Sequence, residues 1–295
     1  MIGFLERLRQ GPLVADGAMG TMLMERGLKP GECPEAFGLA HPEALGEIAR
    51  AYLEAGADII QTNTFGASPL KLASYKLEDK TEEINRKAVE AARRAVAGKA
   101  YVSASCGPTG RLLKPVGDAD PEEVLAAFKR QMKALLDAGA DILCIETMTD
   151  LGEASLAVKA AKSLRPDVPV MATMTFDKTS RGFFTMMGVS VKKAVEGLKA
   201  AGADIVGSNC GNGIEAMVLI AKEMRTLTDL PLIIQANAGL PRLVGGKTVY
   251  PESPEFWAPK AKDLLAAGVS IVGGCCGTTP EHIRAIRDSV SRFRA

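Results

Sequence analysis

The sequence predicts an α/β fold, a closed parallel (β/α)8 TIM barrel that spans residues 1–295 as one domain. Three observations predict it: short apolar runs alternate with helical patterns, one glycine-containing segment recurs four times, and polar and sulfur-containing residues gather where the apolar runs end. An α/β barrel of about 250 residues usually counts as one domain. The alternative is an open doubly wound sheet, which the four-fold recurrence disfavours.

The recurring segment reads as a helix end, a glycine and a buried strand. It is Leu53-Glu-Ala-Gly-Ala-Asp-Ile-Ile60, and it returns at residues 136–143, 199–206 and 265–272. The glycine suits a helix C-cap, and the apolar residues after it suit a buried strand. Four more apolar runs lie between the copies, at residues 12–15, 100–104, 168–174 and 231–236. Together they predict eight strands.

Helical patterns separate these runs. We expect helices at residues 43–55, 81–97, 121–138, 152–164, 190–201, 214–227, 257–267 and 280–293. The last has the clearest start, because Thr279 suits the N-cap and Pro280 the first helical position. Residues 1–10 alternate charged and apolar side chains, and we expect a short surface helix there that closes the bottom of the barrel.

The composition excludes several classes of partner. The net charge is +1 and no long run of Lys or Arg occurs, so neither nucleic acid nor an acidic membrane surface is expected as a partner. We find no signal peptide and no run of 18 apolar residues. Six cysteines in a chain of this length do not make a disulfide framework. We therefore expect a cytoplasmic protein with reduced thiols.

The active site of such a barrel lies at the carboxyl ends of its strands. The predicted strand ends carry residues 16–21, 62–65, 106–110, 146–147, 173–176, 208–210, 235–237 and 275–276. Polar and sulfur-containing residues collect in these segments, while the strand interiors are nearly free of them. This segregation predicts a functional site at the carboxyl-terminal face of the strands.

Two adjacent cysteines, Cys275 and Cys276, lie between glycines where the eighth strand passes into a helix. Neighbouring cysteines rarely bond to each other, because a disulfide needs Cα atoms about 5.5 Å apart. Exposed sulfurs near a helix N-terminus suit metal binding or thiolate chemistry. The alternative is a pair of buried apolar residues. The flanking glycines disfavour it, because they indicate a close approach of the backbone to another group.

Cys210 ends the sixth strand, so only one strand separates it from Cys275 and Cys276 in a barrel. Three thiolates with an open fourth position form a catalytic zinc arrangement. Asn237, at the end of the strand between them, could fill that position through its amide oxygen. Neither histidine of the chain lies at a strand end, which excludes a histidine-based zinc site.

Side-chain alternation along a strand predicts which residues share a face. Three sets should each do so: Ile142, Cys144 and Glu146; Val206, Ser208 and Cys210; and Ile233, Gln235 and Asn237. If the last residue of each set faces the mouth, Cys144 fills the core one layer deeper. We expect structural roles for Cys144 and Cys33, and also for Cys106, although Cys106 lies at a strand end.

Four motifs resemble those of the homocysteine S-methyltransferase family. Gly207-Ser-Asn-Cys-Gly211 and Gly273-Gly-Cys-Cys-Gly-Thr278 resemble its zinc motifs. Asp16-Gly-Ala-Met-Gly-Thr21 and Gln61-Thr-Asn-Thr-Phe65 resemble its first two strand ends. The likeness covers essentially the whole chain and is greatest to the homocysteine-binding module of cobalamin-dependent methionine synthases. Those enzymes continue into folate, cobalamin and reactivation modules, so we expect an excised module or a stand-alone subunit.

The resemblance implies a zinc-bearing catalytic site whose ligands are Cys210, Cys275 and Cys276. It also implies that Asp16 and Glu146 hold the amino group of homocysteine, and that the backbone near Gly17 and Ala18 helps to hold the rest. The implied reaction is zinc-dependent methyl transfer to the thiol of homocysteine, which gives methionine.

We expect the methyl donor to be a methylated corrinoid, such as methylcobalamin, carried by another domain or protein and not bound by this domain alone. Betaine and S-methylmethionine are the alternatives. Betaine is a quaternary ammonium, which proteins usually hold in an aromatic cage. Among the strand-end motifs only Phe65 and Phe176 are aromatic, although Trp257 in the seventh strand–helix connection could reach the mouth.

Two rival functions remain open at the level of sequence. Glycines at the eighth strand end before a helix N-terminus resemble the phosphate site of phosphosugar barrels, although the cysteines argue against that function. A non-enzymatic thiol-based zinc or redox sensor would need a fourth thiolate or a resolving cysteine. Cys106 is the only residue that could supply either.

Overall fold

The computed structural model describes residues 2–245 and 247–294. Its barrel strands are β1 (Leu13–Val14), β2 (Ile59–Gln61), β3 (Tyr101–Cys106), β4 (Ile142–Met148), β5 (Val170–Met174), β8 (Ile205–Gly213), β9 (Leu232–Asn237) and β12 (Ile271–Gly274). They form one eight-stranded sheet in the order β1, β12, β9, β8, β5, β4, β3, β2, in which every pair is parallel. A parallel bridge between Ala15 and Ile59 joins the chain at β1 to β2. The ring is therefore closed, and the predicted (β/α)8 barrel is confirmed.

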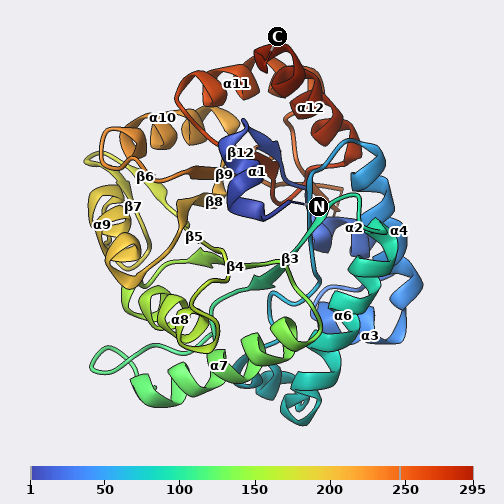
Figure 1. Cartoon of the computed structure of the whole chain (residues 1–295), viewed down its shortest axis with the longest axis vertical. Coiled ribbons are helices and arrows are strands. Elements are labelled where there is room, and N and C mark those ends of the chain that lie inside the picture. Colours follow the sequence, from blue (N-terminus) through green and yellow to red (C-terminus); the bar gives the residue numbers. More distant parts are fainter. Residues whose placement is uncertain (1, 246, 295) are drawn as a thin grey trace.

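Eight helices surround the ring of strands (Figure 1). They are α4 (Pro42–Glu54), α6 (Thr81–Val96), α7 (Pro121–Asp137), α8 (Leu151–Leu164), α9 (Val191–Ala201), α10 (Ile214–Arg225), α11 (Pro254–Ala266) and α12 (Pro280–Arg294). Each corresponds to a predicted helix and differs from it by a few residues at most. The largest difference is at α11, which begins at Pro254 because Ser253 caps it by accepting the N–H of Phe256.

The loops at the carboxyl ends of the strands hold additional elements that were not predicted. The helical ones are α2 (Met19–Glu25), α3 (Pro34–Ala40), α5 (Pro69–Leu72), η1 (Ala73–Tyr75) and η2 (Glu78–Lys80). Two antiparallel hairpins pair β6 (Asp177–Thr179) with β7 (Gly182–Phe184), and β10 (Arg242–Val244) with β11 (Lys247–Val249). All of them are short, and short elements carry too few residues to show a period.

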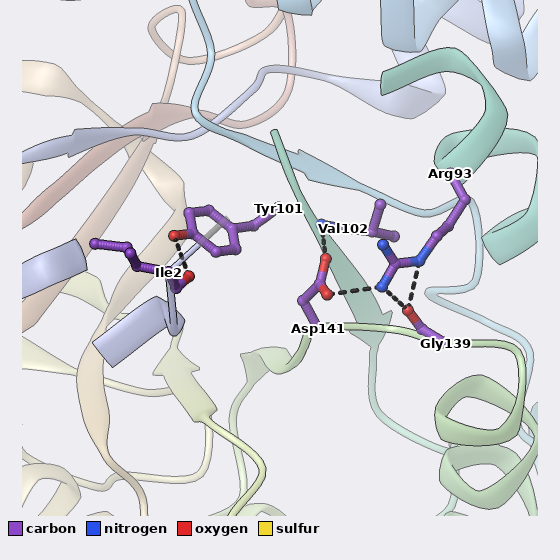
Figure 2. Close-up of polar contacts among 6 residues, drawn as sticks. All are labelled: Ile2, Arg93, Tyr101, Val102, Gly139 and Asp141. Carbon is purple, nitrogen blue, oxygen red and sulfur yellow. Dashed lines mark hydrogen bonds and ion pairs between the residues drawn. The ribbon is translucent and has the colours of Figure 1, made fainter. Parts of the chain in front are cut away.

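The interior of the barrel is an apolar core closed at its amino-terminal end by α1 (Phe4–Arg9). Phe4 and Leu8 of α1 pack with inward-facing strand residues. The rings of Phe4 and Tyr101 pack in a T-shaped arrangement at a centroid distance of 5.2 Å. The Tyr101 hydroxyl donates to the carbonyl of Ile2 at 2.8 Å (Figure 2). The predicted helix at the bottom of the barrel is confirmed for these residues; Met1 lies outside the described part of the chain.

The aspartate of the recurring segment has the same contacts in three copies. It accepts a backbone N–H from the preceding strand and pairs with a basic side chain: Asp58 with Val14 and Arg287, Asp141 with Val102 and Arg93, and Asp204 with Val170 and Lys162. Figure 2 shows the second copy, in which Arg93 also donates to the carbonyl of Gly139. We call each of these contact sets a clamp. In the fourth copy Ser270 replaces the aspartate, and Arg225 donates to the carbonyl of Gly268.

The clamps lie at the amino-terminal end of the strands and tie each pair of strands to a helix. They give a physical reason for the recurrence, since the aspartate bridges two strands and the carbonyls of Gly56, Gly139 and Gly268 accept a basic side chain. The carboxyl-terminal face is left to the loops. Within the described residues, no helix has the length and apolar character needed to cross a bilayer.

Candidate active site

Three sulfur atoms meet at the mouth of the barrel. They belong to Cys210 near the end of β8 and to Cys275 and Cys276 directly after β12, and all lie within 4.8 Å of one another. The Sγ atoms of Cys210 and Cys276 are 3.9 Å apart. The structure therefore brings together the three cysteines that the sequence singled out.

Cys210 reaches the mouth by a route other than the predicted one. Val206 packs between the barrel and the helices, so the alternation places Ser208 on that outer face and Asn209 on the inner one. Cys210 follows with a φ of 59°, and the pairing of β8 with β9 shifts between Asn209 and Gly213. The predicted shared face of Val206, Ser208 and Cys210 is therefore wrong, because the regular strand ends before the cysteine.

The alternation predicted for β4 is confirmed, because Ile142 and Cys144 belong to the inner core and Glu146 lines the mouth. The side chain of Cys106 packs in the cluster between strands and helices, which directs it away from the sulfur cluster. Cys33 lies in a separate small cluster, where its thiol donates to Glu35 at 3.3 Å.

The electrostatics of the sulfur cluster fit a thiophilic cation. The thiols of Cys275 and Cys276 donate toward Cys210 and hold its pKa well below the usual range of a thiol. The same contacts raise the pKa values of Cys275 and Cys276. A divalent ion such as zinc would let all three thiols ionise.

Asn237 stands beside this cluster as predicted. Its side chain contacts Cys210 and helps to lower the pKa of that thiol. Its Oδ1 atom is buried and has no hydrogen-bond partner. Since a buried amide oxygen without a partner is costly, this atom suits a role as a ligand.

A cavity of about 270 Å³ extends from the sulfur cluster across the mouth. Glu146, Gly17 and Ala18 line it together with all three cysteines. Its apolar wall consists mainly of Met19, Met24, Pro34 and Phe65. The cavity thus joins the predicted metal ligands to most of the predicted substrate contacts.

Asp16 and Glu146 are buried carboxylates at this end of the barrel, and neither has a basic partner. Asp16 is 1% exposed and Glu146 is 7% exposed. Burial raises the pKa of Asp16 to about 8 and that of Glu146 to about 7. Asp16 Oδ2 accepts the N–H of Gln61 at 2.7 Å, whereas its Oδ1 has no partner. Among the described residues, no Lys or Arg pairs with either carboxylate, which leaves both available to an ammonium group.

Gly17 and Ala18 shape the wall next to Asp16. A Cβ on Gly17 would lie 2.7 Å from Thr278 Oγ1 and 2.9 Å from the ring of Tyr52, so only glycine fits. The Ala18 N–H donates to Thr278 Oγ1 at 3.1 Å, and its carbonyl accepts the Tyr52 hydroxyl at 3.1 Å. The N–H and the carbonyl of Ala18 thus already form hydrogen bonds within the protein.

The glycines around the cysteine pair serve packing. A Cβ on Gly273 would lie 2.7 Å from that of Ala15, and one on Gly274 would lie 2.2 Å from Thr278 Oγ1. These contacts are with the protein's own side chains, so they explain the glycines without a phosphate group.

Two residues of the site escaped the sequence analysis. Tyr250 lines the cavity and its hydroxyl contacts Cys276, while burial raises the pKa of Tyr250 to about 12. It comes from the loop after β11, and no pattern in the sequence directs it to the mouth. Asn209 contacts both Glu146 and Cys275. Its signal was an amide directly before a cysteine in β8.

The aromatic residues differ from the expectation. Trp257 is fully buried in α11, where its Nε1 donates to Glu252 at 3.0 Å. The expectation that Trp257 could reach the mouth is therefore wrong. Phe176 is also fully buried, in the cluster between strands and helices. Phe65 does line the cavity and is 39% exposed.

Comparison with known proteins gives one family and several relatives. The profile described as homocysteine S-methyltransferase matches residues 13–290. Methionine synthase of Mycobacterium leprae is 34% identical over 307 residues, and that of Mycobacterium tuberculosis is 33% identical over 309 residues. Both alignments cover 98% of this chain and 25% of the relative, so the chain spans about a quarter of the length of these curated relatives.

Solved structures agree with this result. The metallated form of the homocysteine methyltransferase MmuM from Escherichia coli superposes with a TM-score of 0.78 at 27% identity. That likeness covers 95% of this chain and 96% of MmuM. A methyltransferase from Methanosarcina mazei shares the fold, with a TM-score of 0.62 at 12% identity.

Proposed function

The chain belongs to the homocysteine S-methyltransferase family, and we propose that it is a zinc-dependent enzyme that methylates the thiol of homocysteine to give methionine. One observation carries the proposal: a cluster of three sulfurs and the carboxylate of Glu146 line the same cavity of about 270 Å³. Homocysteine has a thiol at one end and an ammonium group at the other. The sulfur cluster and the unpaired carboxylates suit these two ends.

Zinc would be held by Cys210, Cys275 and Cys276, with Asn237 Oδ1 as the fourth ligand before substrate binds. Zinc bound by thiolates lowers the pKa of a further coordinated thiol, which is about 8.5 in free cysteine, and so supplies a nucleophilic sulfur at neutral pH. The solved metallated form of MmuM supports a metal in this fold.

The protein's own groups bind and orient the substrate. Asp16 and Glu146 would hold its ammonium group, and each such charge-assisted hydrogen bond contributes about 1.5–3 kcal/mol. Ser105 and Asn209 donate to Glu146 and keep its carboxylate in place. A substrate fixed in this way presents its sulfur for in-line attack, in which the sulfur–methyl bond forms as the bond between methyl group and donor breaks.

For the donor we propose a methylated corrinoid presented at the mouth by another domain or protein. A corrinoid is too large for the cavity, so its methyl face would have to approach from outside. The two mycobacterial relatives are methionine synthases that extend well beyond the region matched here, which leaves room for further modules in them.

Betaine or S-methylmethionine is the alternative donor. MmuM, which is a homocysteine methyltransferase of similar length, favours a donor that needs no further module. Among the described residues, Phe65 and Tyr250 are the aromatic side chains that line the cavity. Two rings form a poor cage for the quaternary ammonium of betaine.

A thiol-based zinc or redox sensor is the more remote alternative. It would need a fourth thiolate, and Cys106 faces the helices instead of the cluster. We also propose that the protein works in a reducing compartment such as the cytoplasm, because three sulfurs this close would otherwise oxidise readily.

The test supplies zinc-loaded protein and homocysteine with methylcobalamin, a methylated corrinoid protein, betaine or S-methylmethionine in turn. Methionine formed from the corrinoid donors is the expected result. Methionine formed only from betaine or S-methylmethionine would replace the donor and keep the thiol chemistry. No methionine from any donor, together with no homocysteine binding in calorimetry, would contradict the enzyme and favour the sensor.

A further inference from the structure

The buried side-chain amide of Asn209 joins the two halves of the cavity. Its Nδ2 atom lies 3.4 Å from Glu146 Oε2 and 3.9 Å from Cys275 Sγ. Asn209 is fully buried. The carboxylate belongs to the end of the cavity that would hold an ammonium group, and the sulfur belongs to the end that would hold a thiol. One amide thus contacts both ends.

The hydrogen bonds of the amide leave it one orientation. Its Oδ1 accepts the backbone N–H of Thr147 at 2.8 Å and the hydroxyl of Thr173 at 2.7 Å. A backbone N–H can only donate, so the oxygen must face Thr147 and the Nδ2 must face Glu146 and Cys275. Rotation of the amide would leave buried donors and acceptors unpaired.

The same amide spans two irregular strand ends. Thr147 in β4 and Cys210 in β8 both have a φ of 59°, which non-glycine residues rarely adopt. The pairing of β4 shifts between Ile145 and Met148, and β8 has its own shift at Asn209. Such backbone conformations persist where the surroundings hold them. Asn209 bonds to Thr147 through both of its side-chain polar atoms and directly precedes Cys210.

We propose that Asn209 is a positioning residue that fixes the separation between Glu146 and the sulfur cluster, and so selects ligands with an ammonium group and a thiol at the spacing of homocysteine. The inference rests on the proposed function, because it takes Glu146 as the anchor for the ammonium group. A ligand that binds through both of its ends binds more tightly than either end alone only if the two groups of the protein keep the matching distance. Loss of Asn209 should therefore weaken two-ended ligands and spare one-ended ones.

The experiment compares three ligands on zinc-loaded protein. Homocysteine has both ends, 2-aminobutyrate lacks the sulfur and 4-mercaptobutyrate lacks the amino group. The variants are Asn209→Ala and Thr173→Val, the second of which removes only the hydroxyl that orients the amide. Thr173→Ser restores that hydroxyl. Ser208→Ala is the matched control, because it changes the neighbouring residue, whose buried hydroxyl has no partner. Zinc content is measured first for each variant.

We expect Asn209→Ala to weaken homocysteine binding about tenfold and to leave both one-ended ligands within about twofold of wild type. Thr173→Val should show the same pattern with a smaller loss, and Thr173→Ser and Ser208→Ala should match wild type. If Asn209→Ala fails to fold, the ligand affinities of Thr173→Val and Thr173→Ser test the inference instead.

Equal losses for all three ligands would show a general structural role and overturn the inference. Homocysteine affinity that is unchanged in both variants would overturn it as well. Wild-type protein that does not bind homocysteine would contradict the proposed function and the inference with it. If the wild-type protein binds homocysteine, the proposed function stands, and the variants then test the inference alone.

Discussion

The Sγ atoms of Cys210 and Cys276 lie 3.9 Å apart although 66 residues separate them in the chain. β8, which carries Cys210, and β12, which ends shortly before Cys276, flank β9 in the sheet, so the order of the strands creates the contact. β9 in turn ends at Asn237, whose free amide oxygen adjoins the same cluster. The ends of three strands that are neighbours in the sheet thus supply every ligand atom of the proposed metal site.

Replacing any one of the three cluster cysteines by serine should weaken zinc binding by more than about a hundredfold, because a neutral hydroxyl replaces a thiolate ligand. Competition with a chromophoric chelator measures the affinity. Cys106→Ala serves as the control, since its side chain faces the helices. Tight zinc in Cys210→Ser, Cys275→Ser or Cys276→Ser would remove that residue from the site.

Glu146→Gln and Asp16→Asn should each weaken homocysteine binding about tenfold to a hundredfold while zinc stays bound. Each change removes a negative charge opposite the ammonium group, and a charge-assisted hydrogen bond contributes about 1.5–3 kcal/mol. Titration calorimetry gives the affinity. Glu153→Gln is the matched control, because Glu153 is an equally buried carboxylate that Thr109 satisfies away from the cavity. Unchanged affinity in both variants would place the amino group elsewhere.

Asp16 should make the ligand-free protein less stable as the pH rises. Its pKa is about 8 in the folded protein and 3.8 ordinarily, so between these values the folded state binds more protons than the unfolded chain. Stability then falls with rising pH across this window. Asp16→Asn removes the effect, and its Tm should exceed that of wild type by about 2–4 °C at pH 8.

The difference in Tm between Asp16→Asn and wild type should vanish well below pH 3.8, where the carboxyl is protonated in both states. Calorimetric melting across this pH range is the measurement. A variant less stable than wild type at pH 8 would show that the charged carboxylate stabilises the fold.

Tyr250→Phe should change the affinity for zinc by about tenfold, and the variant should still bind zinc. The hydroxyl contacts Cys276, and such partners of metal ligands typically alter affinity by 10–100-fold. The effect should persist at all neutral and mildly alkaline pH values, because the pKa of Tyr250 is raised to about 12. Tyr75→Phe, a change at an exposed tyrosine, is the control. Identical zinc affinities would assign Tyr250 to packing against Gly277 alone.

The barrel and its sulfur cluster could be predicted because each rests on a local or periodic signal. The recurring glycine and aspartate mark the start of a strand wherever they occur, and apolar runs between them mark the remaining strands. Cys275 and Cys276 stand between glycines at such a strand end. Strand order in a closed barrel then brings Cys210 near them without further information.

Asn209 and Tyr250 could not be predicted for two different physical reasons. Regular alternation from Val206 places Asn209 on the inward face. Cys210 reaches the mouth only because its positive φ breaks that alternation, which leaves no mark on the residue type. Tyr250 reaches Cys276 through the path of a long loop, which depends on tertiary contacts such as that of its ring with Gly277. Trp257 lies inside α11 and not in the connection before it, because Ser253 caps a helix that begins three residues before the predicted start.

The clamp at Asp58 has a consequence for how the chain could be rearranged. Its partner Arg287 lies on the last helix, so this clamp and the pairing of β1 with β12 join the end of the chain to its beginning. The clamps at Asp141 and Asp204 make the same contacts within continuous chain. A circular permutant, with the old termini linked and new ones opened at exposed Pro166 and Asp167, would keep every clamp. The strands and helices would thus keep their arrangement in space although their order along the chain has changed.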